Sequence, residues 1–183
     1  MMSCSGNPGC RREESFIFVA RKPEETRLLG SEMAKFSYPG LTICLTGKLG
    51  TGKTEFVRGF AAEFGWENTR SPSFTIINEY RAQTPIAHVD LYRVEEPSGE
   101  EFHLEEYSRD GYVVIVEWAD HLKISSEQGF WKIDLSYPAE TSLYDPANET
   151  IRILRLSCFG RKACLKFREF TVNSVLKLES VRS

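Results

Sequence analysis

The 183-residue sequence predicts an α/β fold with a central mixed, partly parallel sheet flanked by helices. Three observations predict this fold. A short apolar run at 41–45 leads through a glycine-rich loop into an amphipathic helix, which is a strand–loop–helix unit. A second apolar run at 112–116 ends in an acidic residue, as a central parallel strand does at the ligand-binding edge of a sheet. Segments after 130 alternate polar and apolar residues, which favours antiparallel strands on the C-terminal side.

The first two expected elements are a strand and a helix. Residues 15–20 have the composition of a strand. Pro23 stands where a helix can begin, and two glutamates follow it, which suits the partial positive charge at a helix N-terminus. Pro39–Gly40 ends the helix. Its expected buried stripe consists of Leu29, Met33 and Phe36.

A phosphate-binding loop follows the next strand. Residues Gly47–Thr54 read G-K-L-G-T-G-K-T and fit the pattern G-x-x-x-x-G-K-[ST]. Glycines let the backbone turn its N–H groups towards phosphate oxygens, Lys53 can reach the β- and γ-phosphates, and the Thr54 hydroxyl can bind Mg²⁺. We therefore expect a P-loop NTPase-like fold. The expected nucleotide-binding residues of the loop are Gly47, Leu49, Gly50, Thr51, Gly52, Lys53 and Thr54.

The segment after the loop is expected to be an amphipathic helix that ends at Gly65. Its buried positions are Phe56, Val57, Phe60, Ala61 and Phe64. A Ser-Pro-Ser-Phe turn at 71–74 then leads into β-rich residues 75–80. The turn has two interpretations: the ordinary start of a strand, or a mobile segment whose hydroxyls sense the γ-phosphate.

Residues 86–92 form a strand with one polar face. Ala87, Val89 and Leu91 point one way, and His88, Asp90 and Tyr92 point the other. A solvated face of an edge strand is one explanation, and a functional face is the other. With no second histidine or cysteine near it in sequence, His88 is expected to orient a neighbour rather than to bind a metal.

Two acids are candidates for the catalytic and metal-binding roles. Glu117 ends the apolar strand 112–116 and resembles a Walker B acid, while Asp90 ends the strand before it. Because Mg²⁺ usually takes one or two protein ligands besides water and phosphates, we expect Thr54 and one acid to hold the metal and the other acid to position the attacking water. The sequence leaves open whether Asp90 or Glu117 has which role.

The C-terminal third is expected to contain two strands and a basic extension. Residues 131–137 alternate like a half-exposed antiparallel strand, and 151–156 change phase at Ile153–Leu154, which predicts a bulge. Residues 158–183 carry six Lys and Arg against two Glu and could form a helix or stay loose. The expected organisation is a disordered arm at 1–14, one P-loop ATPase domain at 15–157 and this basic extension.

The composition suits an ordinary soluble globule with a net charge of −3, which gives no overall basic footprint for nucleic acid. Five cysteines without a C-x-x-C pair indicate neither a zinc site nor a secreted disulfide framework. No signal peptide or run of membrane length is apparent, so we expect a cytoplasmic protein with no membrane partner.

Four motifs, taken in order, resemble the bacterial TsaE family, formerly called YjeE. They are G-K-L-G-T-G-K-T, S-P-S-F-T-I-I-N-E-Y, H-V-D-L-Y-R and V-I-V-E-W, and the resemblance covers about residues 15–157. It implies a small, weakly active, Mg²⁺-dependent ATPase of tRNA threonylcarbamoyladenosine (t6A) synthesis. Its cofactor would be ATP, its partner the stimulating TsaD–TsaB heterodimer, and tRNA would be met only within that complex.

The resemblance also implies roles for single residues. It maps Mg²⁺ binding onto Thr54 and Glu117, a catalytically important acid onto Asp90, and a base contact onto Thr26. The preference for adenine rests on the resemblance alone. The chain departs from the family pattern at four positions, none of which removes a group that the mechanism needs: Lys48, Glu55, Ser73 and Ala119.

Three other classes of protein carry P-loops of this kind. A small-molecule or nucleotide kinase is the main alternative, but its arginines would have to close over the phosphates, and Arg58, Arg70, Arg81 and Arg93 form no lid-like cluster in sequence. A GTPase is disfavoured because no N-K-x-D signature is present. A nucleotide sensor that does not hydrolyse ATP is the third.

Overall fold

The structure of the protein is a computed structural model. This structure describes residues 15–72, 75–94, 102–122, 124, 129–138 and 150–181. The predicted disordered arm at 1–14 lies outside the described residues, as do Ser73 and Phe74 of the predicted sensing turn. Among the described residues, no helix combines the length and the apolar composition needed to cross a bilayer.

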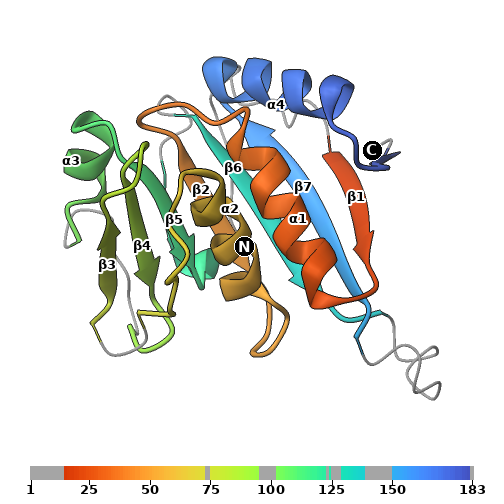
Figure 1. Ribbon diagram of the computed structural model, residues 1–183, viewed down its shortest axis with the longest axis horizontal. Helices are drawn as coiled ribbons and strands as arrows, with labels where there is room; N and C mark the ends of the chain where they lie inside the picture. The colour runs from red at the N-terminus through yellow and green to blue at the C-terminus, as the bar shows by residue number, and fades with distance from the viewer. Residues whose placement is uncertain are drawn as a thin grey trace.

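One mixed sheet of eight strands forms the centre of the molecule, in the order β3-β4-β5-β2-β6-β7-β1-β8 (Figure 1). The strands are β1 Ser15–Ala20, β2 Thr42–Thr46, β3 Ile77–Tyr80, β4 Ile86–Asp90, β5 Val113–Glu117, β6 Phe130–Ser136, β7 Arg152–Phe159 and β8 Glu179–Val181. The four strands β4, β5, β2 and β6 run parallel to one another, and the remaining pairs are antiparallel. The predicted mixed α/β fold is therefore confirmed.

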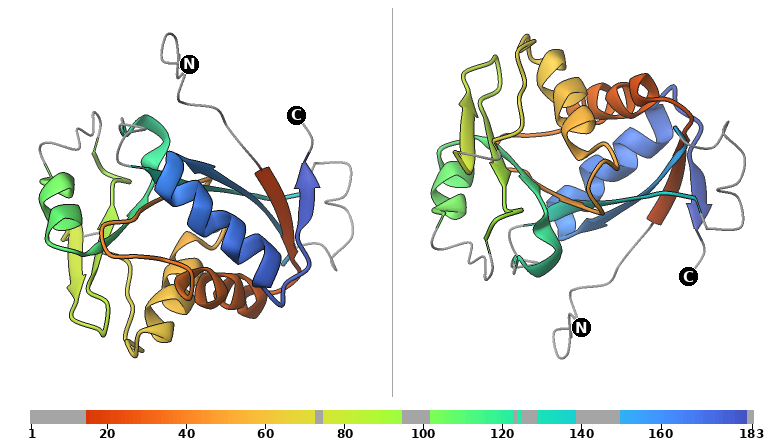
Figure 2. Two further views of the ribbon diagram at one scale, coloured as in Figure 1. Left: turned by 90° about the horizontal axis from the view of Figure 1, so that it is seen from above. Right: turned by 90° about the horizontal axis from the view of Figure 1, so that it is seen from below.

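Helices cover both faces of this sheet. They are α1 Pro23–Ala34, α2 Lys53–Glu63, α3 Leu104–Arg109 and α4 Arg161–Asn173, with a 3-10 turn η1 at Ala119–His121. Figure 2 shows α1, α2 and α4 lying near one another. Their buried residues form one core with the inward side chains of β1, β2, β6 and β7. A smaller core on the other face joins β4 and β5 to α3 and η1. The central strands β2 and β5 are buried on both sides, which explains their continuous apolar sequence.

The P-loop helix packs directly on α1, and a glycine allows this contact. A Cβ atom on Gly59 of α2 would stand 1.9 Å from the carbonyl oxygen of Arg27 in α1. The two helix backbones can touch only because this position has no side chain. This contact places α1 beside the phosphate-binding loop.

One prediction for the C-terminal strands is confirmed in part and another is wrong. β6 is half-exposed and antiparallel to β7, as predicted, but its other neighbour, β2, is parallel to it. β7 contains no bulge, because its pairing with both β1 and β6 runs without a break. The phase change at Ile153–Leu154 reflects unequal burial instead: Leu154 lies in the core, and Ile153 stays half-buried on the other face.

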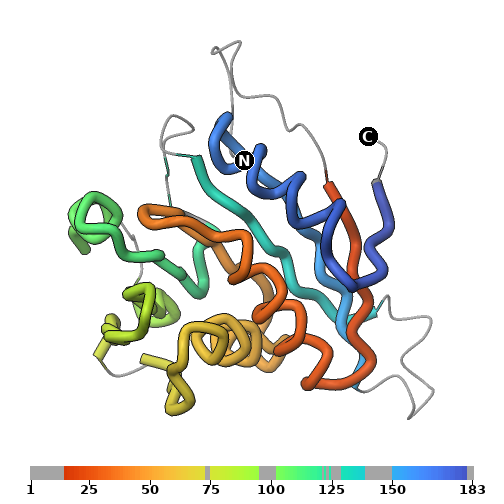
Figure 3. The backbone as a smooth tube through the Cα atoms, turned by 45° about the horizontal axis from the view of Figure 1, so that its top comes forward, coloured from red at the N-terminus to blue at the C-terminus, as the bar shows by residue number. Residues whose placement is uncertain are grey.

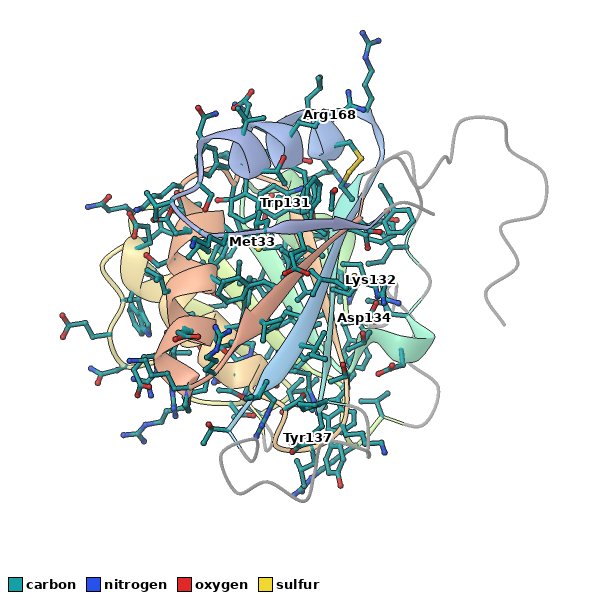
Figure 4. All side chains as sticks on the ribbon, turned by 90° about the vertical axis from the view of Figure 1, so that its right-hand side faces the viewer. Met33, Trp131, Lys132, Asp134, Tyr137 and Arg168 are labelled. Atoms are coloured by element: carbon teal, nitrogen blue, oxygen red, sulfur yellow. A yellow bond between two sulfur atoms is a disulfide. The ribbon has the colours of Figure 1, made fainter. Side chains whose placement is uncertain are left out.

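The segment that the sequence left as an extension belongs to the same domain. The expected boundary at 157/158 falls inside β7, α4 packs Phe167 and Phe170 into the main core, and β8 pairs with β1 (Figure 3). A disulfide joins Cys158, near the end of β7, to Cys164 in the first turn of α4 (Figure 4). The cysteine pattern gave no indication of this bond.

Candidate nucleotide-binding site

The glycine-rich loop leaves β2 and enters α2, as the sequence predicts. Gly47 has a φ of +128°, and a Cβ atom there would stand 2.1 Å from the carbonyl oxygen of Leu135. The first glycine of the motif is therefore required by both conformation and space. Thr51 is fully buried and donates its hydroxyl to the carbonyl oxygen of Lys48 at 2.9 Å, which fixes the curl of the loop.

Lys53 lies inside this curl. Its ammonium group donates to the carbonyl oxygens of Gly47 at 2.7 Å and Lys48 at 3.0 Å. It also lies 3.7 Å from the centre of the Trp118 ring, close enough for a cation–π contact. Burial lowers the pKa of Lys53, and the carboxylates of Glu117, Asp120 and Asp90 oppose this shift. A buried cation with neutral ligands is well suited to receive an anion.

The two candidate acids end neighbouring parallel strands. Asp90 and Glu117 are paired positions of β4 and β5, and both are buried. Glu117 accepts the Thr54 hydroxyl through both carboxylate oxygens, at 2.9 and 3.2 Å. The structure thus brings together the hydroxyl and one of the two acids that the sequence left as candidates for Mg²⁺, the acid that the family resemblance implies.

Asp90 has a separate set of partners. Its Oδ2 accepts the hydroxyl of Ser71 at 2.7 Å, and its Oδ1 accepts the backbone N–H of Tyr92 at 3.0 Å. Ser71 begins the turn that the sequence singled out as a possible phosphate sensor. Asp90 therefore links this turn to the site.

His88 lies behind Glu117 and is fully buried. Its Nε2 is 2.9 Å from Glu117 Oε1, and its Nδ1 is 2.8 Å from the Tyr80 hydroxyl. The idea of a solvated edge-strand face is wrong, because β4 lies between β3 and β5 and its polar face is buried at the site. His88 contacts Glu117 and Tyr80, and the prediction that it orients a neighbour is consistent with these contacts.

A pocket of about 310 Å³ opens between the loop and the ends of β4 and β5. It is lined by Leu49, Gly50, Gly52, Lys53, Thr54, Glu55, Ser71, Asp90, Tyr92, Glu117 and Trp118. Ligands of open α/β sheets bind at this carboxyl edge. Gly47 and Thr51, which the sequence also predicts to bind nucleotide, are not among the lining residues. Thr26 is buried on α1 beside the loop, 3.8 Å from where a Cβ on Gly52 would stand, and does not line the pocket.

Glu55, which places a carboxylate at this pocket, is paired with two arginines. Arg27 from α1 and Arg58 from the next turn of α2 each form an ion pair with it. The Glu55 carboxylate is therefore held by two ion pairs at the edge of the pocket.

The outer side of the loop is held by residues that sequence analysis missed. The Tyr137 hydroxyl, just after β6, donates to the carbonyl oxygen of Leu49 at 3.1 Å (Figure 4). The Arg152 guanidinium donates to the carbonyl oxygen of Gly50 at 3.3 Å and lies 4.3 Å from the Tyr137 ring centre. Both residues are far from the loop in sequence, and no local pattern indicates their position.

The residues present fit a Mg²⁺–nucleotide. No cluster of three or more His, Cys, Asp or Glu able to hold a metal occurs within the described ranges. The arrangement is instead one hydroxyl and one carboxylate beside a buried ammonium group, with space for phosphates. Mg²⁺ favours such sites because phosphates and water complete its coordination.

The mixed sheet, the glycine loop at its carboxyl edge and the buried lysine define the class: an α/β protein with a P-loop-type fold. The family model described as "Threonylcarbamoyl adenosine biosynthesis protein TsaE" matches residues 20–143. The chain belongs to the TsaE family.

Similar proteins agree with this assignment. The chain is 44% identical over 99 residues to the tRNA threonylcarbamoyladenosine biosynthesis protein TsaE of Bacillus subtilis (strain 168), covering 53% of this chain and 62% of that protein. It is 36% identical over 109 residues to the protein of the same name from Aquifex aeolicus (strain VF5), covering 57% and 77%. The aligned part thus spans less than two thirds of the Bacillus relative.

A solved structure resembles the whole fold. The crystal structure of B. subtilis YdiB superposes with a TM-score of 0.66 and 27% identity, covering 89% of this chain and 96% of that one. The likeness therefore extends beyond the residues matched by the family model.

Proposed function

We propose that this chain is the Mg²⁺-dependent ATPase of t6A biosynthesis, acting in the cytoplasm with a TsaD–TsaB heterodimer. Membership of the TsaE family and the names of its relatives support the pathway. One observation carries the activity: Lys53, Thr54, Asp90 and Glu117 converge on one pocket at the carboxyl edge of the sheet. tRNA would meet the chain only within the assembled complex.

The residues divide the work of phosphoryl transfer to water. Lys53 and the backbone N–H groups of the loop would bind the phosphates. Thr54 and Glu117 would hold Mg²⁺, which when bound offsets charge on the phosphate oxygens. Asp90, beside Glu117 at the end of the neighbouring strand, would orient the attacking water. The separate partners of the two acids, Thr54 for one and Ser71 for the other, support this division.

Dependence on a partner follows from the charges near the pocket. Arg27 and Arg58 are both paired with Glu55, and Arg152 donates to the carbonyl oxygen of Gly50 on the outer side of the loop. Stabilising the developing charge on the γ-phosphate with an additional cation typically accelerates P-loop hydrolases about 10³–10⁵-fold. A chain whose nearby arginines are already paired would turn over slowly until a partner supplied or ordered such a group.

The test is ATP hydrolysis by the purified chain, alone and with TsaD–TsaB, at saturating Mg²⁺. We expect slow turnover that rises at least about tenfold with the heterodimer. The Lys53→Ala variant should neither bind nor hydrolyse ATP, and Lys166→Ala, which changes an exposed lysine paired with Glu169, should behave as wild type. Turnover that stays unchanged when TsaD–TsaB is added would contradict the proposal.

A further inference from the structure

A continuous line of buried polar groups leads away from the site behind Glu117. It runs from Thr54 through Glu117 and His88 to the Tyr80 hydroxyl, with contacts of 2.9, 2.9 and 2.8 Å. His88 is fully buried, and Glu117 and Tyr80 are each 3% exposed. Each of these polar groups must find its hydrogen bonds inside the protein, because water cannot replace them.

The chemistry of the partners fixes the direction of the first bond. A carboxylate oxygen only accepts, so the hydrogen between His88 and Glu117 is carried by His88 Nε2. A buried carboxylate held by both Thr54 and His88 has little freedom to rotate about its last bond. His88 thereby selects the orientation in which Glu117 faces Thr54.

Tyr80 connects this line to the turn beside Asp90. Its hydroxyl lies 2.8 Å from His88 Nδ1 and 3.0 Å from the carbonyl oxygen of Arg70. The next residue, Ser71, donates to Asp90 at 2.7 Å. The hydroxyl carries one hydrogen and can donate to only one of these two groups at a time. It lies between the backbone that carries Ser71 and the side chain that orients Glu117.

The Tyr80 ring is itself held by packing. It stacks on Trp66 with ring centres 5.3 Å apart and an interplanar angle of 21°. Removing only the hydroxyl would leave this stack in place. The hydrogen bonds and the packing of Tyr80 can therefore be separated by experiment.

We propose that His88 and Tyr80 are positioning residues of the ATPase reaction, an inference that rests on the proposed function. Neither touches the pocket. They hold Glu117 in the orientation that serves Mg²⁺ and couple it to residues 70–71, so that both acids are set by one hydrogen-bonded unit. Groups that orient a metal ligand in this way typically contribute about 10–100-fold to activity or metal affinity.

Three variants test the proposal. His88→Leu removes both hydrogen bonds, and His88→Gln replaces the donor to Glu117 because the glutamine amide nitrogen can occupy the place of Nε2. Tyr80→Phe removes the hydroxyl alone. We expect kcat to fall about 10–100-fold in His88→Leu and less in Tyr80→Phe, with partial recovery in His88→Gln. The affinity for ADP in EDTA should stay at the wild-type value, whereas the gain in affinity on adding Mg²⁺ should shrink.

Tyr107→Phe is the matched control. It removes a hydroxyl that donates to the Glu79 carboxylate at 2.9 Å, on α3 and away from the pocket. It should change neither kcat nor the Mg²⁺ dependence. Circular dichroism and thermal unfolding of all variants identify any that fail to fold, and Tyr80→Phe keeps the test valid if His88→Leu is among them.

A readout in the nucleotide-free chain keeps the inference separate from the proposed function. Long-range proton–nitrogen NMR of His88 should show a proton on Nε2 in wild type and an altered balance of the two ring nitrogens in Tyr80→Phe. Unchanged kcat and Mg²⁺ dependence in folded His88→Leu, or a His88 without a proton on Nε2, would overturn the inference. A wild-type chain that shows this proton but binds no nucleotide would overturn the proposed function alone.

Discussion

Asp90 and Glu117 occupy paired positions at the ends of the parallel strands β4 and β5, yet their carboxylates face different partners. Glu117 accepts the hydroxyl of Thr54, the last residue of the phosphate-binding motif, and Asp90 accepts that of Ser71, in the turn after the P-loop helix. The sheet thus places the two acids side by side, and the surrounding segments give each acid a different hydrogen-bond donor.

This separation makes Asp90→Asn a test of the division of roles. The amide keeps the size of the side chain and can still accept the Tyr92 N–H, but it cannot polarise water as a carboxylate does. We expect kcat to fall at least about 100-fold while the dissociation constant for Mg–ADP changes by less than about threefold. Steady-state hydrolysis and calorimetric titration measure the two quantities.

Two further variants serve as comparisons for Asp90→Asn. Glu117→Gln should weaken the binding of ADP only when Mg²⁺ is present, because Glu117 and its hydrogen-bond partner Thr54 are the proposed Mg²⁺ ligands. Asp110→Asn changes an exposed acid after α3 and should have no effect. Normal turnover in Asp90→Asn would mean that the acid has another role.

Lys53 should make the stability of the nucleotide-free protein depend on pH. Burial lowers its pKa in the folded chain below the value of 10.5 for an exposed lysine. Between the two pKa values the unfolded chain binds more protons, so the contribution of Lys53 to the free energy of unfolding rises with pH. Below that range, burying the charged lysine costs stability.

The measurement compares Lys53→Met with wild type by urea unfolding from pH 7 to pH 10. The variant should be the more stable protein at pH 7 without nucleotide, and its advantage should shrink as the pH approaches 10.5. A constant difference over this range would show that Lys53 does not titrate differently in the folded chain.

Glu55 should weaken the binding of ATP. Its carboxylate lines the pocket at the first turn of α2, where an anionic phosphate would also benefit from the helix dipole. Glu55→Ala removes this charge and leaves Arg27 and Arg58 beside the phosphates. We expect the ATP affinity to rise a few-fold, equivalent to roughly 0.5–1 kcal/mol, with a larger effect at low salt.

The matched control is Glu63→Ala at the other end of the same helix, where the carboxylate accepts the Ser31 hydroxyl. Its ATP affinity should equal that of wild type. An affinity that falls in Glu55→Ala would mean that the glutamate organises the two arginines rather than competing with phosphate.

The Cys158–Cys164 bond should contribute modestly to stability. The two cysteines are six positions apart in the sequence. For a loop this short, the chain-entropy relation gives a stabilisation of about 2 kcal/mol. Thermal unfolding with and without reductant measures this difference. A Cys158→Ala, Cys164→Ala double variant should show no response to reductant, and an equal response in that variant would point to another cause.

Much of this architecture could be predicted because its signals are local. The glycine motif needs an adjacent strand and helix, and residues 41–64 supply both through their periodicity. The apolar run before Glu117 predicts a strand buried on both faces, and β5 is one. The elements at Ser15–Ala20 and Pro23–Ala34 begin where composition and Pro23 indicate.

The remainder depends on contacts between distant parts of the chain. Alternation along β6 reveals which side chains point inward but not that one neighbour is parallel and the other antiparallel. The contact of Arg152 with Gly50 spans 102 residues. Whether the polar face of β4 meets solvent or the carboxylate of Glu117 depends on β3 and β5, which the sequence of β4 does not specify.

The position of β1 has a consequence for biosynthesis. Its two neighbours in the sheet, β7 and β8, come from the C-terminal third of the chain (Figure 3). During synthesis on the ribosome, β1 therefore emerges long before either of its partner strands has been made. Its apolar side chains stay unpaired until residues 152–181 have been synthesised. Such non-local pairing slows folding and leaves an aggregation-prone apolar strand exposed until its partners are available. We expect the nascent chain to be a client of chaperones, and the sheet to close only after residues 152–181 have left the ribosome.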